Sequence, residues 1–196
     1  PVNENHILTL ERYEKDIRKA VSGVDCFFDA FGGVCVTAEY IANKSLDALL
    51  EEKKWWDKIG LSVIVSFIEE INHFPGLTLC DAVPVYYERS MDYYKDVLSK
   101  MGHLGLKRAL FTTQAPIEAN YSEQQIYNKM KESFKILSEY AGQRQLKILL
   151  TNTRFRIAAD VKQQKQMLQQ IGVSANMGLA VNLNHLSEQE YSQSID

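Results

Sequence analysis

Apolar and polar residues recur with two different periods along this chain, one typical of helices and one typical of strands. Amphipathic helices are predicted at 9–21, 45–60, 85–105, 122–141 and 160–172. In the first of them, apolar residues share one face at the positions Leu10, Tyr13, Ile17 and Val21. The helix at 122–141 begins with a capping box, in which Ser122 is the N-cap and Gln125 is the third helical residue.

Short apolar segments separate these helices and predict strands. They lie at 23–31, 61–68, 106–113, 146–152 and 177–185. The segment 61–68, LSVIVSFI, is rich in β-branched residues and apolar on both faces, which is typical of a strand covered on both sides. Because a helix separates each strand from the next, the crossover connections return every strand in the same direction. The sequence therefore predicts a parallel α/β sheet.

Two architectures fit this order of elements, a (β/α)8 TIM-like barrel and an open doubly wound parallel sheet. A nucleotide-binding open sheet usually has a glycine-rich turn after its first strand, but AFGGVC at 30–35 does not match G-x-G-x-x-G. Units of roughly 30 to 45 residues suit a barrel. A whole barrel takes ~250 residues, whereas this chain has 196 and about five β-α units. We therefore expect a single, incomplete barrel domain over 1–196 that lacks the first and the last two strands.

Composition and charge exclude several classes of function. A net charge of −3 and a pI of about 5.9 supply no general positive field for nucleic acid. The longest apolar runs are far shorter than the ~20 residues of a membrane span, and the first residues lack the apolar region of a signal peptide. Cys26, Cys35 and Cys80 have neither C-x-x-C nor zinc spacing, as in reduced thiols. These features predict a cytoplasmic protein that binds neither nucleic acid nor membrane.

Several motifs follow the predicted elements in a characteristic order. They are the segment from Lys58 to Val63, the pair Leu104 and Gly105 at the end of a long helix, and the strands ILLTN and GLAVNLNH. In this order the chain resembles the xylose isomerase-like TIM-barrel superfamily, which includes sugar phosphate isomerases and epimerases. The resemblance covers most of the chain and implies action on a sugar or polyol at the carboxyl-terminal mouth of the barrel. It also implies a divalent metal (Mn, Mg, Zn or Co), and a homo-oligomer is compatible with it.

The metal ligands implied by this resemblance are altered in the chain. The family site takes Glu, Asp, His and Glu from successive strands, and the last two of these strands are expected to lie outside the chain. The family pattern l.lEN falls on ILLTN, so Thr151 replaces the glutamate and Asn152 keeps the asparagine. The pattern gl.lD..H falls on GLAVNLNH, so Asn182 replaces the aspartate and His185 keeps the histidine. An acid that often closes the second strand falls on Phe28. A hard divalent cation prefers anionic oxygen, which neutral threonine and asparagine do not provide.

The remaining candidate site residues lie where predicted strands end. We expect His185 to contact substrate, Asn152 and Asn182 to bind polar ligand groups, and Arg154 to hold a phosphate or carboxylate. Glu69 follows the strand 61–68 and is a weaker candidate base. Ordinary structural roles compete with each of these, namely a histidine bound to a loop carbonyl, a turn asparagine or a solvated charge. Weaker candidates at the mouth are Asp29, Glu70, Thr113, Gln114 and Arg156.

Two hypotheses from different classes of function stay open. The first is a sugar or polyol isomerase or epimerase that is completed by segments outside this chain. The second is a non-catalytic barrel that serves as a ligand-binding or regulatory module. The simultaneous changes at Thr151 and Asn182 favour the second. A nuclease is a distant third, because the chain lacks a basic surplus and a dense set of acidic and histidine ligands.

Overall fold

The structure is a computed structural model that describes residues 33–58, 62–67, 78–81, 83–113, 122–152, 160–172 and 176–180. In this part of the chain five strands form one sheet: β1 (Gly33–Thr37), β2 (Ser62–Ser66), β3 (Arg108–Thr112), β4 (Lys147–Thr151) and β5 (Met177–Ala180). The described helices are α2 (Ala38–Ala42), α3 (Leu46–Lys58), α5 (Pro84–His103), α6 (Glu123–Gly142) and α7 (Val161–Ile171). None of them has the length and apolarity that crossing a bilayer requires.

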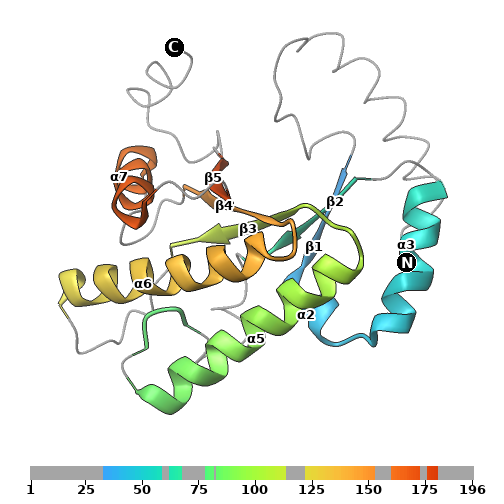
Figure 1. The fold of residues 1–196 in the computed structure, drawn as a ribbon, viewed down its shortest axis with the longest axis horizontal. Helices are drawn as coiled ribbons and strands as arrows, with labels where there is room; N and C mark the ends of the chain where they lie inside the picture. Colours follow the sequence, from blue (N-terminus) through green and yellow to red (C-terminus); the bar gives the residue numbers. More distant parts are fainter. Residues whose placement is uncertain are drawn as a thin grey trace, which may run out of the picture.

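The order of the strands distinguishes between the two predicted architectures. Neighbouring strands follow the chain, β1-β2-β3-β4-β5, and every pair is parallel. A doubly wound sheet reverses direction at a switch point, which this order does not do. Right-handed crossovers that all step in one direction place their helices on one face, and α5, α6 and α7 follow one another along one side of the sheet in Figure 1. The predicted barrel-type sheet is confirmed, and the open doubly wound alternative does not fit.

The first described strand and helix, β1 and α2, are elements that the hydrophobic pattern did not predict. The predicted helix 9–21 and strand 23–31 lie outside the described residues. β1 instead includes part of the glycine-containing segment 30–35, and it pairs with β2 along its whole length. Thr37 ends this strand and caps α2, because its Oγ1 accepts a hydrogen bond from the backbone N–H of Tyr40 at 3.2 Å. The β-branched residues Val34, Val36 and Thr37 favour an extended backbone here, and pairing with β2 completes the strand.

The remaining elements lie close to their predicted positions. The capping box of α6 is confirmed, since Ser122 Oγ accepts from the backbone N–H of Gln125 at 3.3 Å and Gln125 Oε1 accepts from that of Ser122 at 2.9 Å. After α5 the chain turns at Gly105, whose φ of +68° favours glycine. These local signals mark where α6 begins and where α5 ends.

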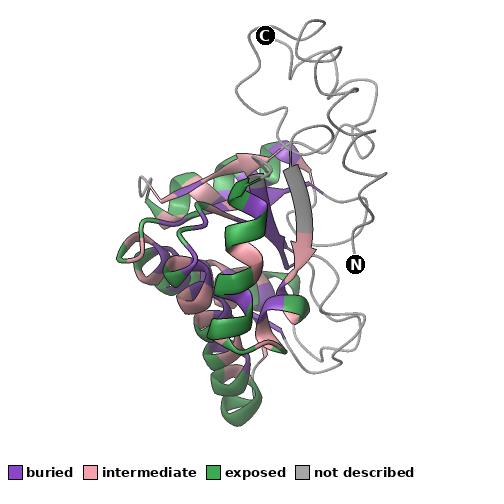
Figure 2. Ribbon diagram, turned by 90° about the vertical axis from the view of Figure 1, so that its right-hand side faces the viewer, coloured by how far each residue is buried: buried purple, intermediate pink, exposed green. Residues whose placement is uncertain are grey.

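The core lies between the sheet and its helices. Figure 2 shows the buried residues gathered on the strands and on the helix sides that face them. An aromatic stack occupies its centre, where the ring centroids of Phe67 and Phe111 are 4.1 Å apart and Phe134 meets Phe111 edge-on at 5.8 Å. The strand side chains in this core are Val63, Val65, Ala109, Phe111, Ile148, Leu150 and Met177.

Alternation along each strand places the intervening residues on the opposite face, away from the helices. The register joins them into rows that run across the sheet. One row contains Ser66, Leu110, Leu149 and Gly178, and the next row toward the carboxyl ends contains Thr112, Thr151 and Ala180. In a barrel this face points inward, so the second row lines the inside of the mouth.

Candidate functional site

The carboxyl ends of β2, β3 and β4 carry buried polar side chains at the edge of the sheet where barrel enzymes bind their ligands. They are Ser66, Thr112, Thr113, Thr151 and Asn152. All five are neutral hydroxyl or amide groups. We take this edge as the candidate site.

Thr112 and Thr151 form the centre of this edge. They are direct register partners on β3 and β4, on the face opposite the helices. Only 8% of Thr112 and 4% of Thr151 are exposed, and among the described residues neither hydroxyl forms a hydrogen bond. Burying a hydroxyl without a partner costs about 1–3 kcal/mol. The two adjacent hydroxyls can therefore form hydrogen bonds with a polar group of a ligand.

The other polar groups of the edge are already occupied. Ser66, Thr113 and Asn152 each have an interaction partner within the protein. Asn152, the predicted ligand-binding residue, is 2% exposed, so reaching a ligand would require it to exchange that partner. The two threonine hydroxyls are more available to a ligand than the predicted amide.

The end of β4 is tied to the helix that follows it. The backbone carbonyl oxygen of Thr151 accepts a hydrogen bond from Nε2 of Gln164 at 2.7 Å. Gln164 lies on α7, whose N-cap Asp160 accepts from the backbone N–H of Gln163 at 2.6 Å. The cap fixes the start of α7, and Gln164 connects that start to the candidate site.

Comparison with known proteins shows which solved structures share this fold. No model of a protein family matches the chain, and no curated protein matches its sequence. A solved D-psicose 3-epimerase, determined in the presence of D-fructose, matches with a TM-score of 0.75 and 11% identity over 96% of this chain and 62% of its own. The D-psicose 3-epimerase of Clostridium cellulolyticum H10, solved with D-tagatose, matches with a TM-score of 0.68 and 13% identity. This match covers 89% of this chain and 58% of the epimerase. The 3-keto-D-glucoside 4-epimerase of E. coli, in its apo form, matches with a TM-score of 0.63 and 15% identity. This match covers 100% of this chain and 70% of the epimerase.

This is the xylose isomerase-like TIM-barrel fold. The predicted resemblance is confirmed at the level of the fold, and the chain spans about 60% of the length of the first two matches. At 11–15% identity the likeness concerns the fold alone. In a xylose isomerase-like barrel, Thr112 and Thr151 face the mouth, where the carboxyl ends of the strands converge.

The described part of this mouth does not fit the divalent metal that the xylose isomerase-like fold implies. Its strand ends offer neutral hydroxyl and amide oxygens, and the position expected for a glutamate holds Thr151. Among the described residues no three His, Cys, Asp or Glu side chains are grouped in a way that could hold a metal ion. A hard cation needs anionic oxygen to replace its water, so we derive no step through a metal here.

Most of the predicted site residues lie outside the described residues, and their roles stay predictions. These are Asp29, Glu69, Glu70, Gln114, Arg154, Arg156, Asn182 and His185. Of the predicted positions, the structure places Thr113, Thr151 and Asn152 together at the ends of β3 and β4.

Two residues at this mouth were missed from sequence. Thr112 was overlooked in favour of Thr113, because the side that each faces depends on the register with β4. Gln164 was overlooked because glutamine is normally an exposed helix residue. A signal was present, since Gln164 shares a helical face with Val161 and Met167, and all three are buried.

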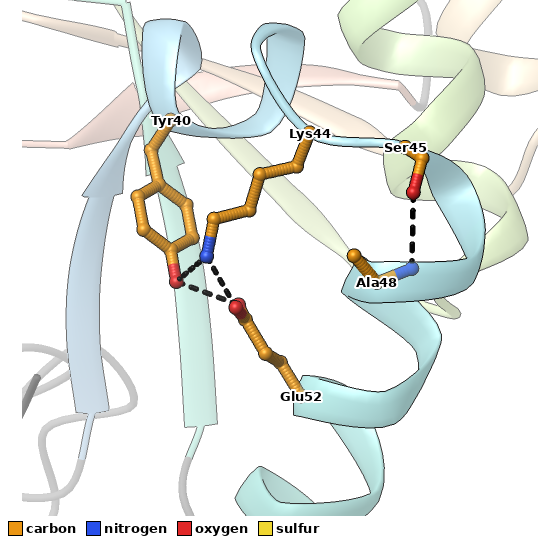
Figure 3. Close-up of polar contacts among 5 residues, drawn as sticks. All are labelled: Tyr40, Lys44, Ser45, Ala48 and Glu52. Carbon is orange, nitrogen blue, oxygen red and sulfur yellow. Dashed lines mark hydrogen bonds and ion pairs between the residues drawn. The ribbon is translucent and has the colours of Figure 1, made fainter.

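A second polar cluster joins α2 to α3 (Figure 3). The hydroxyl of Tyr40 donates to Glu52 Oε2 at 2.6 Å, and the ammonium of Lys44 contacts both the Tyr40 hydroxyl and the Glu52 carboxylate. Burial and the hydrogen bond to Glu52 raise the pKa of Tyr40, so its phenol stays protonated. Burial acts to raise the pKa of Glu52, but the hydrogen bonds from Lys44 and Tyr40 outweigh it and lower that pKa. These groups satisfy one another, so the cluster acts as a structural link.

Proposed function

We propose that this chain binds a sugar or polyol at the mouth of a xylose isomerase-like barrel. The observation that carries the proposal is the buried pair of Thr112 and Thr151, whose hydroxyls face the same side and lack partners among the described residues. Each hydroxyl can donate and accept a hydrogen bond, as can each hydroxyl of a polyol. Adjacent strands lie about 4.8 Å apart, so the two threonines can bind two groups of one small ligand.

The described part of the mouth carries only neutral buried polar groups, and this affects whether the site is expected to bind a sugar or to react with it. Hydroxyl groups bind and orient a sugar, but they do not supply the base that removes a proton from carbon. The proposal therefore places binding first and gives the Thr112 and Thr151 pair a role in affinity and orientation. Arg154, Asn152 and Asn182 are proposed as further ligand-binding residues on the grounds of their positions in the sequence.

A sugar isomerase or epimerase is the second candidate. The observation that favours it is that the matched solved structures include several sugar 3- and 4-epimerases. Under this proposal His185 contacts the substrate and Glu69 serves as a base.

Calorimetric titration of the full chain with D-psicose, D-tagatose and D-fructose tests the first candidate. We expect saturable binding of at least one sugar, and loss of that binding in Thr112→Val and Thr151→Val, which remove a hydroxyl with little change of shape. Thr112→Ser and Thr151→Ser keep the hydroxyl and are the matched controls, which we expect to bind. Binding that survives both valine substitutions, or no binding to any sugar, would overturn the proposal.

Metal content separates the two candidates. For the binding module we expect no stoichiometric metal in the natively purified protein, measured by mass spectrometry after incubation with manganese. Near one metal ion per chain, lost in His185→Ala, together with interconversion of sugars at carbon 3 or 4, would instead establish the epimerase.

A further inference from the structure

We propose that Gln164 is a positioning residue for the sugar site, because it holds the Thr151 backbone in the orientation that presents the Thr151 hydroxyl. This inference rests on the proposed function. Gln164 lies on helix α7 and not on the inner face of the sheet, where the ligand is proposed to bind. Its side chain reaches Thr151 through the backbone carbonyl oxygen, to which Nε2 donates at 2.7 Å.

The burial of Gln164 favours a specific role for its polar group. It is 1% exposed and lies between Val161 and Met167 on the buried face of α7. A methionine or leucine would pack at such a position without burying an amide. A buried amide is costly unless it is hydrogen-bonded, and the bond to Thr151 is the one that this side chain makes among the described residues.

The carbonyl that Gln164 binds is the one where β4 ends. Thr151 is the last residue of β4, so its peptide group lies at the limit of the ladder that holds the rest of the strand. A hydrogen bond from a buried donor fixes that peptide group and keeps it from turning toward solvent. Threonine is β-branched and has few allowed χ1 rotamers, so a fixed backbone also fixes the direction of its hydroxyl.

The donor itself is held on a rigid element. The backbone N–H of Gln164 donates to the Asp160 carbonyl oxygen at 3.1 Å, in the first turn of α7. The Asp160 side chain caps the same turn. Gln164 is thus fixed before any ligand arrives, and such support from a rigid neighbour is what makes a binding group effective.

Two variants of the full chain test this role. Gln164→Met keeps the length of the side chain and removes the donor, whereas Gln166→Met makes the same change at an exposed position of α7. We expect Gln164→Met to weaken sugar binding roughly 10-fold. Loss of a residue that hydrogen-bonds to a metal-binding side chain has an effect of this size. We expect Gln166→Met to bind as the wild type does. Equal affinity of the two variants would overturn the inference.

A measurement without sugar separates this inference from the proposed function. The three-bond couplings of the Thr151 γ-methyl group, measured by NMR, report whether its side chain keeps one rotamer. We expect one rotamer in the wild type and in Gln166→Met, and averaged rotamers in Gln164→Met. If no sugar binds but the couplings change as expected, the proposed function fails and the positioning of Thr151 stands. Unchanged couplings in Gln164→Met would overturn the positioning itself.

Should Gln164→Met fail to fold, the wild type still decides the question. A buried donor that holds the Thr151 carbonyl predicts slow solvent exchange of a Gln164 side-chain amide proton and a nuclear Overhauser contact from it to the adjoining peptide. Fast exchange would overturn the inference.

Discussion

The backbone carbonyl oxygen of Ala42, at the end of α2, accepts a hydrogen bond from Lys100 of α5 at 2.8 Å. The same ammonium group lies 3.4 Å from the Ile41 carbonyl oxygen and 3.2 Å from that of Lys44. The last carbonyls of a helix lack partners within the helix, and a cation there also complements the helix dipole. Lys100, which lies 58 positions after Ala42 in the sequence, therefore caps the carboxyl end of α2.

Lys100→Met should lower the free energy of unfolding by about 1.5–3 kcal/mol, because it removes hydrogen bonds from a charged donor. Urea denaturation measures this change. Lys107→Met, at an exposed position, is the control and should change the stability by less than about 0.5 kcal/mol. Equal effects of the two substitutions would show that the cap contributes nothing specific.

Thr112→Val and Thr151→Val should each stabilise the protein without ligand and, under the proposed function, weaken sugar binding. Each substitution removes a buried hydroxyl that lacks a partner among the described residues, so we expect the free energy of unfolding to rise by about 0.5–1 kcal/mol. Thermal unfolding without and with sugar measures both effects. A loss of stability in Thr151→Val without sugar would mean that this hydroxyl is already hydrogen-bonded.

The cluster of Tyr40, Lys44 and Glu52 predicts a dependence of stability on pH. The pKa of Glu52 is lower in the folded protein than its ordinary value of 4.5. Its contribution is therefore present above that value and is lost as the pH falls through the lower, folded-state pKa. Because these side chains are about one-third exposed, we expect the contribution to be about 0.2–1 kcal/mol.

Unfolding free energies measured in urea from pH 7 to pH 3 check this expectation. Glu52→Gln should be less stable than the wild type at pH 7, and the difference should shrink in acid. Glu51→Gln, which breaks the more exposed ion pair with Lys54 on α3, is the matched control and should change the stability less. A constant difference between Glu52→Gln and the wild type at every pH would contradict the assignment.

Phe111 should be among the costliest residues of the core to truncate. It is 1% exposed and contacts the rings of Phe67, Tyr94 and Phe134. Phe111→Ala leaves a cavity between the sheet and two helices and should cost about 3–5 kcal/mol. Tyr86→Ala, at a residue that is 52% exposed, should cost less than about 1 kcal/mol. Denaturant midpoints that differ little between these variants would contradict the described packing.

The sequence by itself determined the helices α3, α5, α6 and α7, the strands β2 to β5 and the parallel α/β class. Their signals are local: apolar residues at helical spacing, the capping box at Ser122 and Gln125, and β-branched runs. It also supported the likeness to xylose isomerase-like barrels, because the order of elements along the chain limits the folds that can form.

Only the tertiary structure decided which residues form the mouth. β1 is completed by its pairing with β2, a strand 29 residues further along the chain in register, as in the pair Gly33 and Ser62. Thr112 rather than Thr113 faces inward because β3 pairs with β4 in a register that places Thr112 beside Thr151. Successive side chains of a strand then point to opposite faces of the sheet. Gln164 becomes a partner of Thr151 because α7 packs against β5 and α6, which brings Gln164 to the end of β4. Register and packing join residues that are distant in sequence, so no local pattern contains them.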